Sequence, residues 1–272
     1  MRVGSMRSFK LTISYDGGDF AGWQRQTNRR TVQGELEDAL LSVTGEPMAA
    51  VASSRTDAGV HAIGQIVSID SRTKMSANRL REALNSRLPD DVVVRDVEEM
   101  VPGFLSLRDT VRKRYRYVIQ DGRLRNVLSR RYAWHVRYAL DADLMHRAAQ
   151  LLAGTHEFDS FESSGSRRVT TLRTIFEIGV WRRESDEGSR VVFEVEANGF
   201  LYNMVRNITG TLVAVGRGYR DVAWVTSVLE AKDRRQAGMA APPQGLFLVR
   251  VDVAEGLRLG DAAVRAENSR AS

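Results

Sequence analysis

The sequence predicts an α+β protein built from two ferredoxin-like or RRM-like lobes, each with the element order β-α-β-β-α-β. Two observations support this prediction. First, apolar residues recur with strand and helix periods in the same order in both halves of the chain. Second, the dipeptide Pro102-Gly103 breaks regular structure between the halves. We expect the lobes to share a mainly antiparallel sheet with helices on one face.

The first half begins with a strand in which apolar residues alternate. Thr31 and Ser76 each stand before apolar positions at helical spacing, where a hydroxyl caps a helix, and the second helix stops at Pro89. The predicted elements are strands at 9–15, 48–53, 63–70 and 92–98, with helices after Thr31 and Ser76. This is one complete β-α-β-β-α-β unit.

The second half repeats this order with one extra helix. Asp141 caps a helix, and Asn198-Gly199 turns the chain into an apolar helix. The predicted elements are strands at 112–120, 172–184, 190–197 and 246–253, and helices after Asp141, at 200–215 and at 224–231. The two halves are not alike in sequence, so the predicted repeat depends on element order alone.

The chain has 272 residues, 43% of them hydrophobic, which is enough for two domains with a core each. We assign residues 8–105 to an N-terminal lobe and 106–255 to a C-terminal lobe, joined near 101–110. Residues 256–272 lack hydrophobic periodicity, so we predict that they form a mobile tail.

The charge balance favours a nucleic acid partner. Forty basic residues stand against 34 acidic ones, for a net charge of +6. Only four of the basic residues are lysines, and arginine suits bidentate phosphate contacts and stacking on bases better than lysine. A bias in codon usage gives the same arginine excess, so composition alone leaves this open.

Several function classes are excluded by what the sequence lacks. Without cysteine there is no disulfide, thiolate metal site or thiol nucleophile. The four histidines form no HExxH pair, and neither a GxGxxG nor a P-loop motif occurs. No apolar run approaches membrane-spanning length and the first residues resemble no signal peptide, so we expect a cytoplasmic protein without membrane contact.

The most unusual segment joins the second and third predicted strands. It sets a cation, a hydroxyl and a carboxylate side by side before a glycine, as Arg55-Thr56-Asp57-Ala58-Gly59. A glycine here lets the backbone turn tightly and bring a substrate close to Asp57. An ordinary Asx-turn, with Arg55 in solvent, fits the same residues. Local composition leaves both interpretations open.

Together with motifs along the chain, this segment resembles the tRNA pseudouridine synthase A family, which isomerises uridines in the anticodon stem-loop of tRNA. The resemblance runs from about Phe9 to Val253. The motifs that carry it are Tyr15-Asp16-Gly17, Gly22-Trp23-Gln24-Arg25-Gln26, Thr31-Val32-Gln33, Arg55 to His61, Lys113 to Tyr117, Met145 to Ala149, Phe158 to Phe161, Asn198 to Leu201, Met204 to Asn207, Ala231 to Arg234 and Gly245-Leu246.

The resemblance implies roles for four residues. Asp57 matches the catalytic aspartate, a nucleophile that must be ionised, and Arg206 matches the active-site arginine that holds it charged. Tyr115 matches the tyrosine that packs on the target base, and Arg55 matches the residue that enters the stem as the base leaves. From the residues alone, Arg206 is also compatible with a surface arginine, and Tyr115 with a plain strand residue.

The resemblance also implies tRNA as partner, a homodimer, modification at positions 38, 39 and 40, and no cofactor or metal. Three departures affect the expected fit to RNA more than the chemistry. Ser54 stands where glycine is common, Leu107 where arginine is usual and Asn203 where histidine is frequent.

Two rival functions remain open at this stage. One is a non-catalytic RNA-binding module that reuses the same lobes, and the other is an isomerase of the same chemistry that acts on another RNA. For His61 we expect a structural or RNA-backbone role, because the proposed chemistry needs no imidazole. Trp23 is compatible with RNA contact and with packing.

Overall fold

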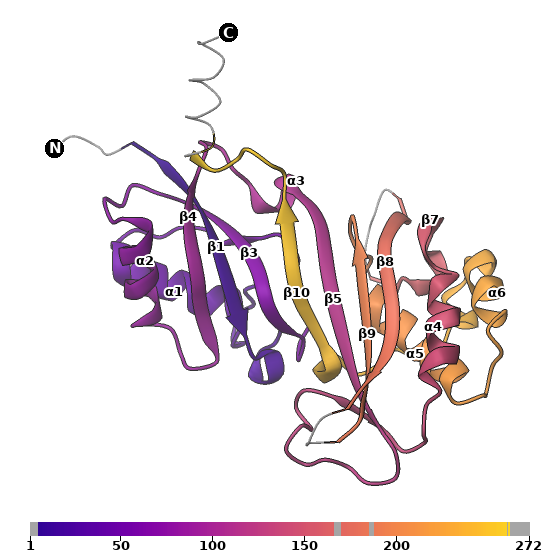
Figure 1. The fold of residues 1–272 in the computed structure, drawn as a ribbon. Coiled ribbons are helices and arrows are strands. Elements are labelled where there is room, and N and C mark those ends of the chain that lie inside the picture. The colour runs from indigo at the N-terminus through magenta and orange to yellow at the C-terminus, as the bar shows by residue number, and fades with distance from the viewer. Residues whose placement is uncertain (1–4, 166–169, 185–187, 260, 262–272) are drawn as a thin grey trace. The chain divides into compact units, whose positions relative to one another are not determined.

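The computed structural model describes residues 5–165, 170–184, 188–259 and 261. The chain divides into two compact units, one of Met1–Val111 with Leu248–Ser272 and the other of Arg112–Phe247. Each unit combines helices with mainly antiparallel strand pairs, which confirms the predicted α+β class (Figure 1). Residues 260 and 262–272 of the predicted tail lie outside the described residues.

The sheet of the first unit has the order β4-β1-β3-β10, and β2 also pairs with β3. Strand β1 runs antiparallel to both of its neighbours. The helix α2 packs on β4 and on α1. The elements of this unit are β1 (Arg7–Tyr15), η1 (Gly17–Asp19), α1 (Val32–Thr44), β2 (Val51–Ala52), β3 (His61–Ser71), α2 (Ala77–Asn85), β4 (Val92–Met100), α3 (Ser106–Asp109) and β10 (Leu246–Val253).

In the first unit, β1, α1 and α2 lie where the sequence predicts them. Phe9, Leu11 and Ile13 of β1 are fully buried, as strand alternation predicts. The hydroxyls of Thr31 and Ser76 accept the expected capping hydrogen bonds at the starts of α1 and α2. Local side-chain chemistry is therefore sufficient to set these element boundaries.

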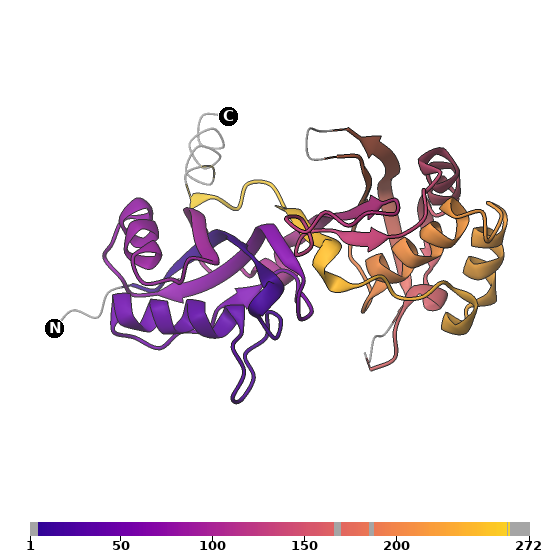
Figure 2. The ribbon, with the colours of Figure 1, turned by 90° about the horizontal axis from the view of Figure 1, so that it is seen from below.

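In the second unit the sheet order is β5-β9-β8-β7, with β6 parallel to β5. The helix α4 packs on β8 and on α5, and Figure 2 shows the helices of this unit gathered beside one another. The elements are β5 (Thr110–Asp121), β6 (Trp134–Val136), α4 (Ala142–Gln150), β7 (Gly154–Glu157), η2 (Asp159–Phe161), β8 (Leu172–Arg183), β9 (Arg190–Ala197), α5 (Met204–Gly216), α6 (Trp224–Ala231), η3 (Arg234–Gln236) and η4 (Pro243–Gly245).

Several elements differ from the sequence prediction. Strand β2 keeps only two residues of the range 48–53, and β6 and β7 are additional. The helix α5 begins at Met204 rather than at residue 200, because Asn203 adopts a left-handed conformation with φ 59° that interrupts a helix. From Leu248 onward the last strand belongs to the first unit, where it follows β3, although we placed 246–253 in the second lobe.

Candidate active site

Asp57 lies in the loop between β2 and β3, in the first unit. Its neighbour Thr56 is buried and is held twice: its hydroxyl is 2.7 Å from the Tyr15 hydroxyl, and its carbonyl accepts the backbone N–H of Trp23 at 3.0 Å. On the other side, the carbonyl of Asp57 accepts the N–H of Val60 at 3.1 Å. The backbone on both sides of the half-buried Asp57 is therefore fixed before any substrate arrives.

A buried amide holds the start of the same loop. Gln65 is fully buried on β3, and its Nε2 donates to the Ser54 carbonyl at 2.6 Å while its Oε1 accepts from the Ser53 hydroxyl at 2.9 Å. Ser54 stands where glycine is common in the related family, and its backbone carbonyl is hydrogen-bonded to Gln65 of the sheet. Arg55, the next residue, is exposed.

One glycine is required for this arrangement. Gly22 has φ +98°, and a Cβ at this position would lie 2.8 Å from the Thr56 carbonyl oxygen and 3.2 Å from the Ala58 nitrogen. Only glycine combines this backbone conformation with so close an approach to the loop of Asp57. The segment Gly22-Trp23 therefore forms one wall of the loop.

His61 and Trp23 are both 2% exposed. The Nδ1 atom of His61 accepts the backbone N–H of Gly17 at 3.1 Å and lies 3.0 Å from the Asp16 carboxylate. The ring of Trp23 packs 6.4 Å from the ring of Tyr15, centroid to centroid. Burial of this degree supports a structural role for His61 and packing for Trp23.

Arg206 stands in the first turn of α5, in the second unit. Its Nη1 donates to the Asn203 side-chain oxygen at 2.7 Å, and its Nε donates to the Ala241 carbonyl at 2.7 Å. The backbone N–H of Ala241 in turn donates to the Arg206 carbonyl at 3.0 Å. The guanidinium is thus held from two directions, by the residue before α5 and by a segment 35 residues further along the chain.

The segment that holds Arg206 also holds Tyr117. The Tyr117 hydroxyl donates to the Pro242 carbonyl at 2.6 Å, next to the carbonyl that Arg206 uses. Burial raises the pKa of the Tyr117 hydroxyl well above its usual value, and the positive charge of Arg206 opposes that rise. Tyr117 therefore remains a protonated donor at neutral pH.

Tyr115 lies on β5, two residues before Tyr117 and on the same face of the strand. Its ring meets the ring of Phe200 edge to face, with centroids 5.0 Å apart. Only 6% of Tyr115 is exposed, and the contact with Phe200 helps to fix the orientation of its ring.

The four predicted site residues thus fall into two pairs. Arg55 and Asp57 share one loop of the first unit, and Tyr115 and Arg206 belong to the second unit. Sequence reasoning missed the contacts of Asn203 and Ala241 with Arg206. Asn203 carried a signal, because it departs from the residue frequent in the related family.

The arginines on β5 are paired with glutamates. The side chains of Arg114 and Arg116 pair with Glu194 and Glu196 of the neighbouring strand β9, and Arg112 pairs with Glu196. Arg114 also reaches Glu177 on β8. Much of the positive charge of Arg112, Arg114 and Arg116 is therefore balanced by glutamates within the sheet.

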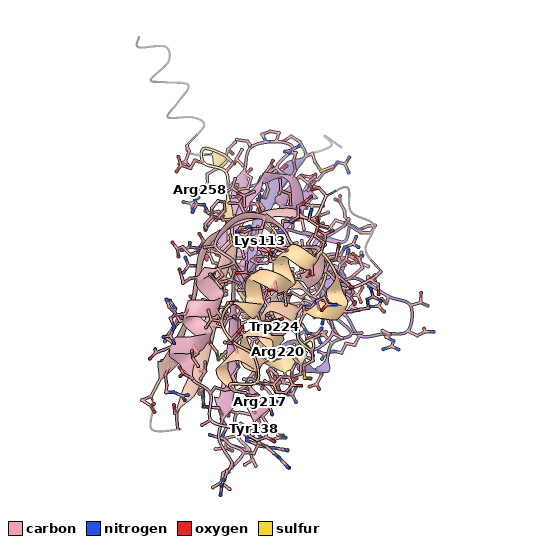
Figure 3. All side chains as sticks on the ribbon, turned by 90° about the vertical axis from the view of Figure 1, so that its right-hand side faces the viewer. Lys113, Tyr138, Arg217, Arg220, Trp224 and Arg258 are labelled. Carbon is pink, nitrogen blue, oxygen red and sulfur yellow. The ribbon has the colours of Figure 1, made fainter. Side chains whose placement is uncertain are left out.

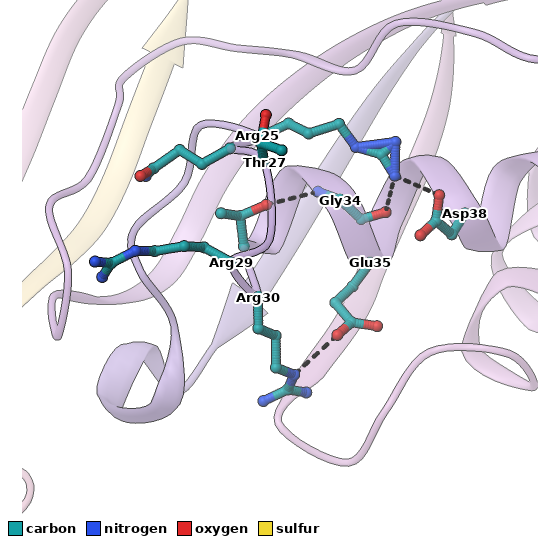
Figure 4. A pocket seen from close by; sticks show the side chains of 9 residues that line it. Arg25, Thr27, Arg29, Arg30, Gly34, Glu35 and Asp38 are labelled. Carbon is teal, nitrogen blue, oxygen red and sulfur yellow. Dashed lines mark hydrogen bonds and ion pairs between the residues drawn. The ribbon is translucent and has the colours of Figure 1, made fainter.

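A pocket of about 410 Å³ lies between the loop 25–31 and the start of α1 (Figure 4). Arg25 pairs with Asp38, and Arg30 pairs with Glu35 at 2.8 Å and with Asp91. Arg29 makes no ion pair or side-chain hydrogen bond with the described residues, and Figure 4 shows it extending away from Glu35 and Asp38. The pocket thus mixes both charges.

The described part of the chain holds no group of three or more His, Asp or Glu side chains placed to bind a metal ion. No helix among the same residues is long and apolar enough to cross a membrane.

Comparison with known proteins identifies the family. A family profile described as tRNA pseudouridine synthase matches residues 11–102 and 148–252. A tRNA pseudouridine synthase A of Thermoanaerobacter sp. (strain X514) is 42% identical over 246 residues, 90% of this chain and 99% of that protein. The proteins of the same name from Halalkalibacterium halodurans and Pseudoalteromonas atlantica are also 42% identical, over 92% of this chain and 94% and 93% of their own lengths. The chain therefore belongs to the tRNA pseudouridine synthase family and is an isomerase that converts uridine to pseudouridine in tRNA.

Proposed function

We propose that this enzyme modifies uridines at positions 38, 39 and 40 of the tRNA anticodon stem-loop, with Asp57 as its nucleophile. The observation that carries the proposal is the fixed backbone of the Asp57 loop, held through Thr56 by Tyr15 and Trp23. A nucleophile reacts fastest when its position is already fixed before the substrate binds.

In the proposed reaction the Asp57 carboxylate attacks the ribose carbon that bears the uracil, and a bond between them forms as the bond to nitrogen 1 of uracil breaks. The uracil rotates and its carbon 5 bonds to the same ribose carbon, which releases the Asp57 carboxylate. The hydrogen on carbon 5 leaves as a proton, and nitrogen 1 of the product carries a proton. Asp57 acts as an anion in this step, so a guanidinium that faces it favours catalysis. We assign this charge to Arg206, as the family resemblance implies; two hydrogen bonds, to Asn203 and Ala241, hold its guanidinium.

Two further residues act on the RNA. Tyr115, whose ring meets Phe200 edge to face, packs against the target base. Arg55 is exposed directly before the buried Thr56, where its guanidinium can occupy the space that the extruded base leaves in the stem. Extrusion of a paired base costs a few kcal/mol, which a stacked guanidinium offsets in part.

The proposal includes the assembly and the place of action. We propose a homodimer, as the family resemblance implies, and action in the cytoplasm, where the tRNA substrate is found. Light scattering after size exclusion tests the dimer directly: a mass near twice the 30.4 kDa chain supports it, and the mass of one chain contradicts it.

Release of tritium from tRNA transcripts labelled at carbon 5 of uridine tests the function. We expect release from transcripts with uridine at position 38, 39 or 40, and none when all three positions carry cytidine. Asp57→Asn is expected to abolish release, whereas Asp90→Asn, a change at an exposed aspartate, leaves it unchanged. Tritium release that persists without uridine at these positions favours the rival hypothesis, an isomerase of the same chemistry that acts on another RNA.

A further inference from the structure

The second unit carries an arginine–aromatic surface, formed by Tyr138, Arg217, Tyr219, Arg220 and Trp224. We propose that this surface is a second RNA-binding site, at which the two guanidiniums bind phosphates and the rings stack on an unpaired base. The inference rests on the proposed function only in taking the bound RNA to be the tRNA substrate.

The surface is built from stacked pairs. The guanidinium carbon of Arg217 lies 4.2 Å from the ring centroid of Tyr138, and that of Arg220 lies 5.3 Å from Tyr219 and 5.1 Å from Trp224. Figure 3 shows Trp224, Arg220, Arg217 and Tyr138 following one another down one side of the unit. These contacts orient the guanidiniums through cation–π attraction and leave their N–H groups available.

The charges of this surface are not neutralised by the protein. Neither Arg217 nor Arg220 makes an ion pair or a side-chain hydrogen bond with the described residues. By contrast, Arg114 on the sheet of the same unit pairs with Glu194 and Glu196, and Arg182 binds Asp121 at 2.8 Å. The surface therefore presents two positive charges that still lack an anionic partner.

Two of the three rings of the surface, those of Tyr138 and Tyr219, are open to solvent, and Trp224 is half-buried. Tyr138 is 58% exposed and Tyr219 is 74% exposed, which is unusual for aromatic side chains of this size. An exposed ring beside a guanidinium offers a base a stacking platform and its phosphate a cation at the same time. Unpaired RNA satisfies both features, whereas an acidic peptide satisfies only the charge.

The position in the fold places this surface within reach of the same RNA. Arg206 lies in the first turn of α5 and Arg217 directly follows its last residue, Gly216. Eleven residues of helix correspond to about 16 Å. That length is about five stacked nucleotide steps at roughly 3.4 Å each. A tRNA held at Arg206 is therefore long enough to contact the arginine–aromatic surface as well.

Binding of unmodified tRNA at a series of salt concentrations tests the proposal. We expect the variant R217A/R220A to bind at least tenfold more weakly and the slope of log K against log salt to fall by about two, one for each lost phosphate contact. The control R183A/R235A removes two other exposed arginines and is expected to keep the affinity and slope of the parent. Equal losses in the two double variants would overturn the proposal.

The aromatic contribution is tested separately with Tyr219→Ala, because this side chain is largely exposed and its loss leaves the core intact. We expect weaker binding with an unchanged salt slope, since a stacking contact releases no counterions. An unchanged affinity contradicts the stacking role. If poly-glutamate rather than tRNA requires the two arginines for binding, the surface takes a protein partner and the proposal is wrong.

Failure of this inference is distinguishable from failure of the proposed function. With the tRNA concentration raised to saturation, R217A/R220A is expected to form pseudouridine at the rate of the parent, with a raised KM. A parent protein that forms no pseudouridine but binds tRNA through these arginines would refute the proposed function and leave the surface standing.

Discussion

The Nη1 atom of Arg206 donates a hydrogen bond to the side-chain oxygen of Asn203, three residues earlier, at 2.7 Å. Asn203 precedes α5 with φ 59° and makes no capping hydrogen bond to the helix, although asparagine is well suited to cap one. Its side chain holds the guanidinium instead. In the proposed mechanism Asn203 is therefore a positioning residue, which acts only through Arg206.

The first prediction concerns this contact. Asn203→Gly relieves the left-handed backbone and removes the oxygen that Arg206 binds. We expect kcat to fall by about tenfold or more, because a hydrogen bond to a charged group contributes roughly 1.5–3 kcal/mol, while stability stays equal or rises. Tritium release and urea denaturation measure the two effects. Asn28→Gly, at the other left-handed asparagine (φ 59°), is the control and is expected to leave kcat unchanged.

The second prediction concerns the docking of the segment that holds Arg206. A Cβ at Gly210 of α5 would lie 1.7 Å from the Met239 carbonyl oxygen, so Gly210→Ala must push residues 238–241 away. We expect a loss of about 1–3 kcal/mol in the free energy of unfolding, together with lower activity as Ala241 moves from Arg206. Denaturation in urea reports the first effect.

Gly45→Ala provides the comparison for Gly210→Ala. Gly45 has φ +73° but no atom within 4 Å of the added Cβ, so only backbone strain is introduced. We expect Gly45→Ala to keep full activity. Equal activity of the two variants would show that the segment after α6 does not control Arg206.

The third prediction concerns the Asp57 loop. Thr56→Val removes the hydroxyl that meets Tyr15 at 2.7 Å and keeps the shape of the side chain. We expect kcat to fall several-fold, because the backbone beside Asp57 loses one of its anchors, whereas Thr56→Ser retains the hydroxyl and most of the activity. Valine and serine variants of equal kcat would speak against the anchor.

The fourth prediction concerns pH. Because burial raises the pKa of Tyr117, the folded protein keeps this proton at pH values where the unfolded chain, with a pKa of about 10, has lost it. The folded state then binds more protons, so the free energy of unfolding falls as pH rises above about 10, and the contribution is complete below that value. Urea denaturation between pH 8 and 11 should show a steeper decline for the parent than for Tyr117→Phe. An equal decline in the free energy of unfolding for both proteins would contradict a raised pKa of Tyr117.

The sequence could predict the parts of the fold that depend on neighbouring residues. The caps at Thr31 and Ser76 and the alternation in β1 follow from local chemistry, and the structure confirms them. The family resemblance, confirmed by the comparisons, singled out Asp57 in a loop that the structure shows to be fixed on both sides.

Contacts between distant parts of the chain were beyond such reasoning. The Ala241 carbonyl accepts a hydrogen bond from Arg206, which lies 35 residues earlier in the chain. Strand β10 belongs to the sheet of the first unit, although nearly all of the second unit precedes it in the chain. No periodic pattern of residues in the sequence predicts either contact. The ion pairs of Arg114 and Arg116 on β5 could not be read from the sequence either, because their glutamate partners lie on another strand, β9.

Mapping of pseudouridine tests whether the enzyme modifies positions 38, 39 and 40 with Asp57 as its nucleophile. An unmodified tRNA transcript with uridine at positions 38, 39 and 40 is incubated with the parent, Asp57→Asn or Asp90→Asn, without added metal or nucleotide, and analysed by primer extension after carbodiimide treatment. We expect stops at these positions with the parent and Asp90→Asn and none with Asp57→Asn. Stops that persist with Asp57→Asn, or their absence with a parent protein that binds the transcript, would contradict this expectation.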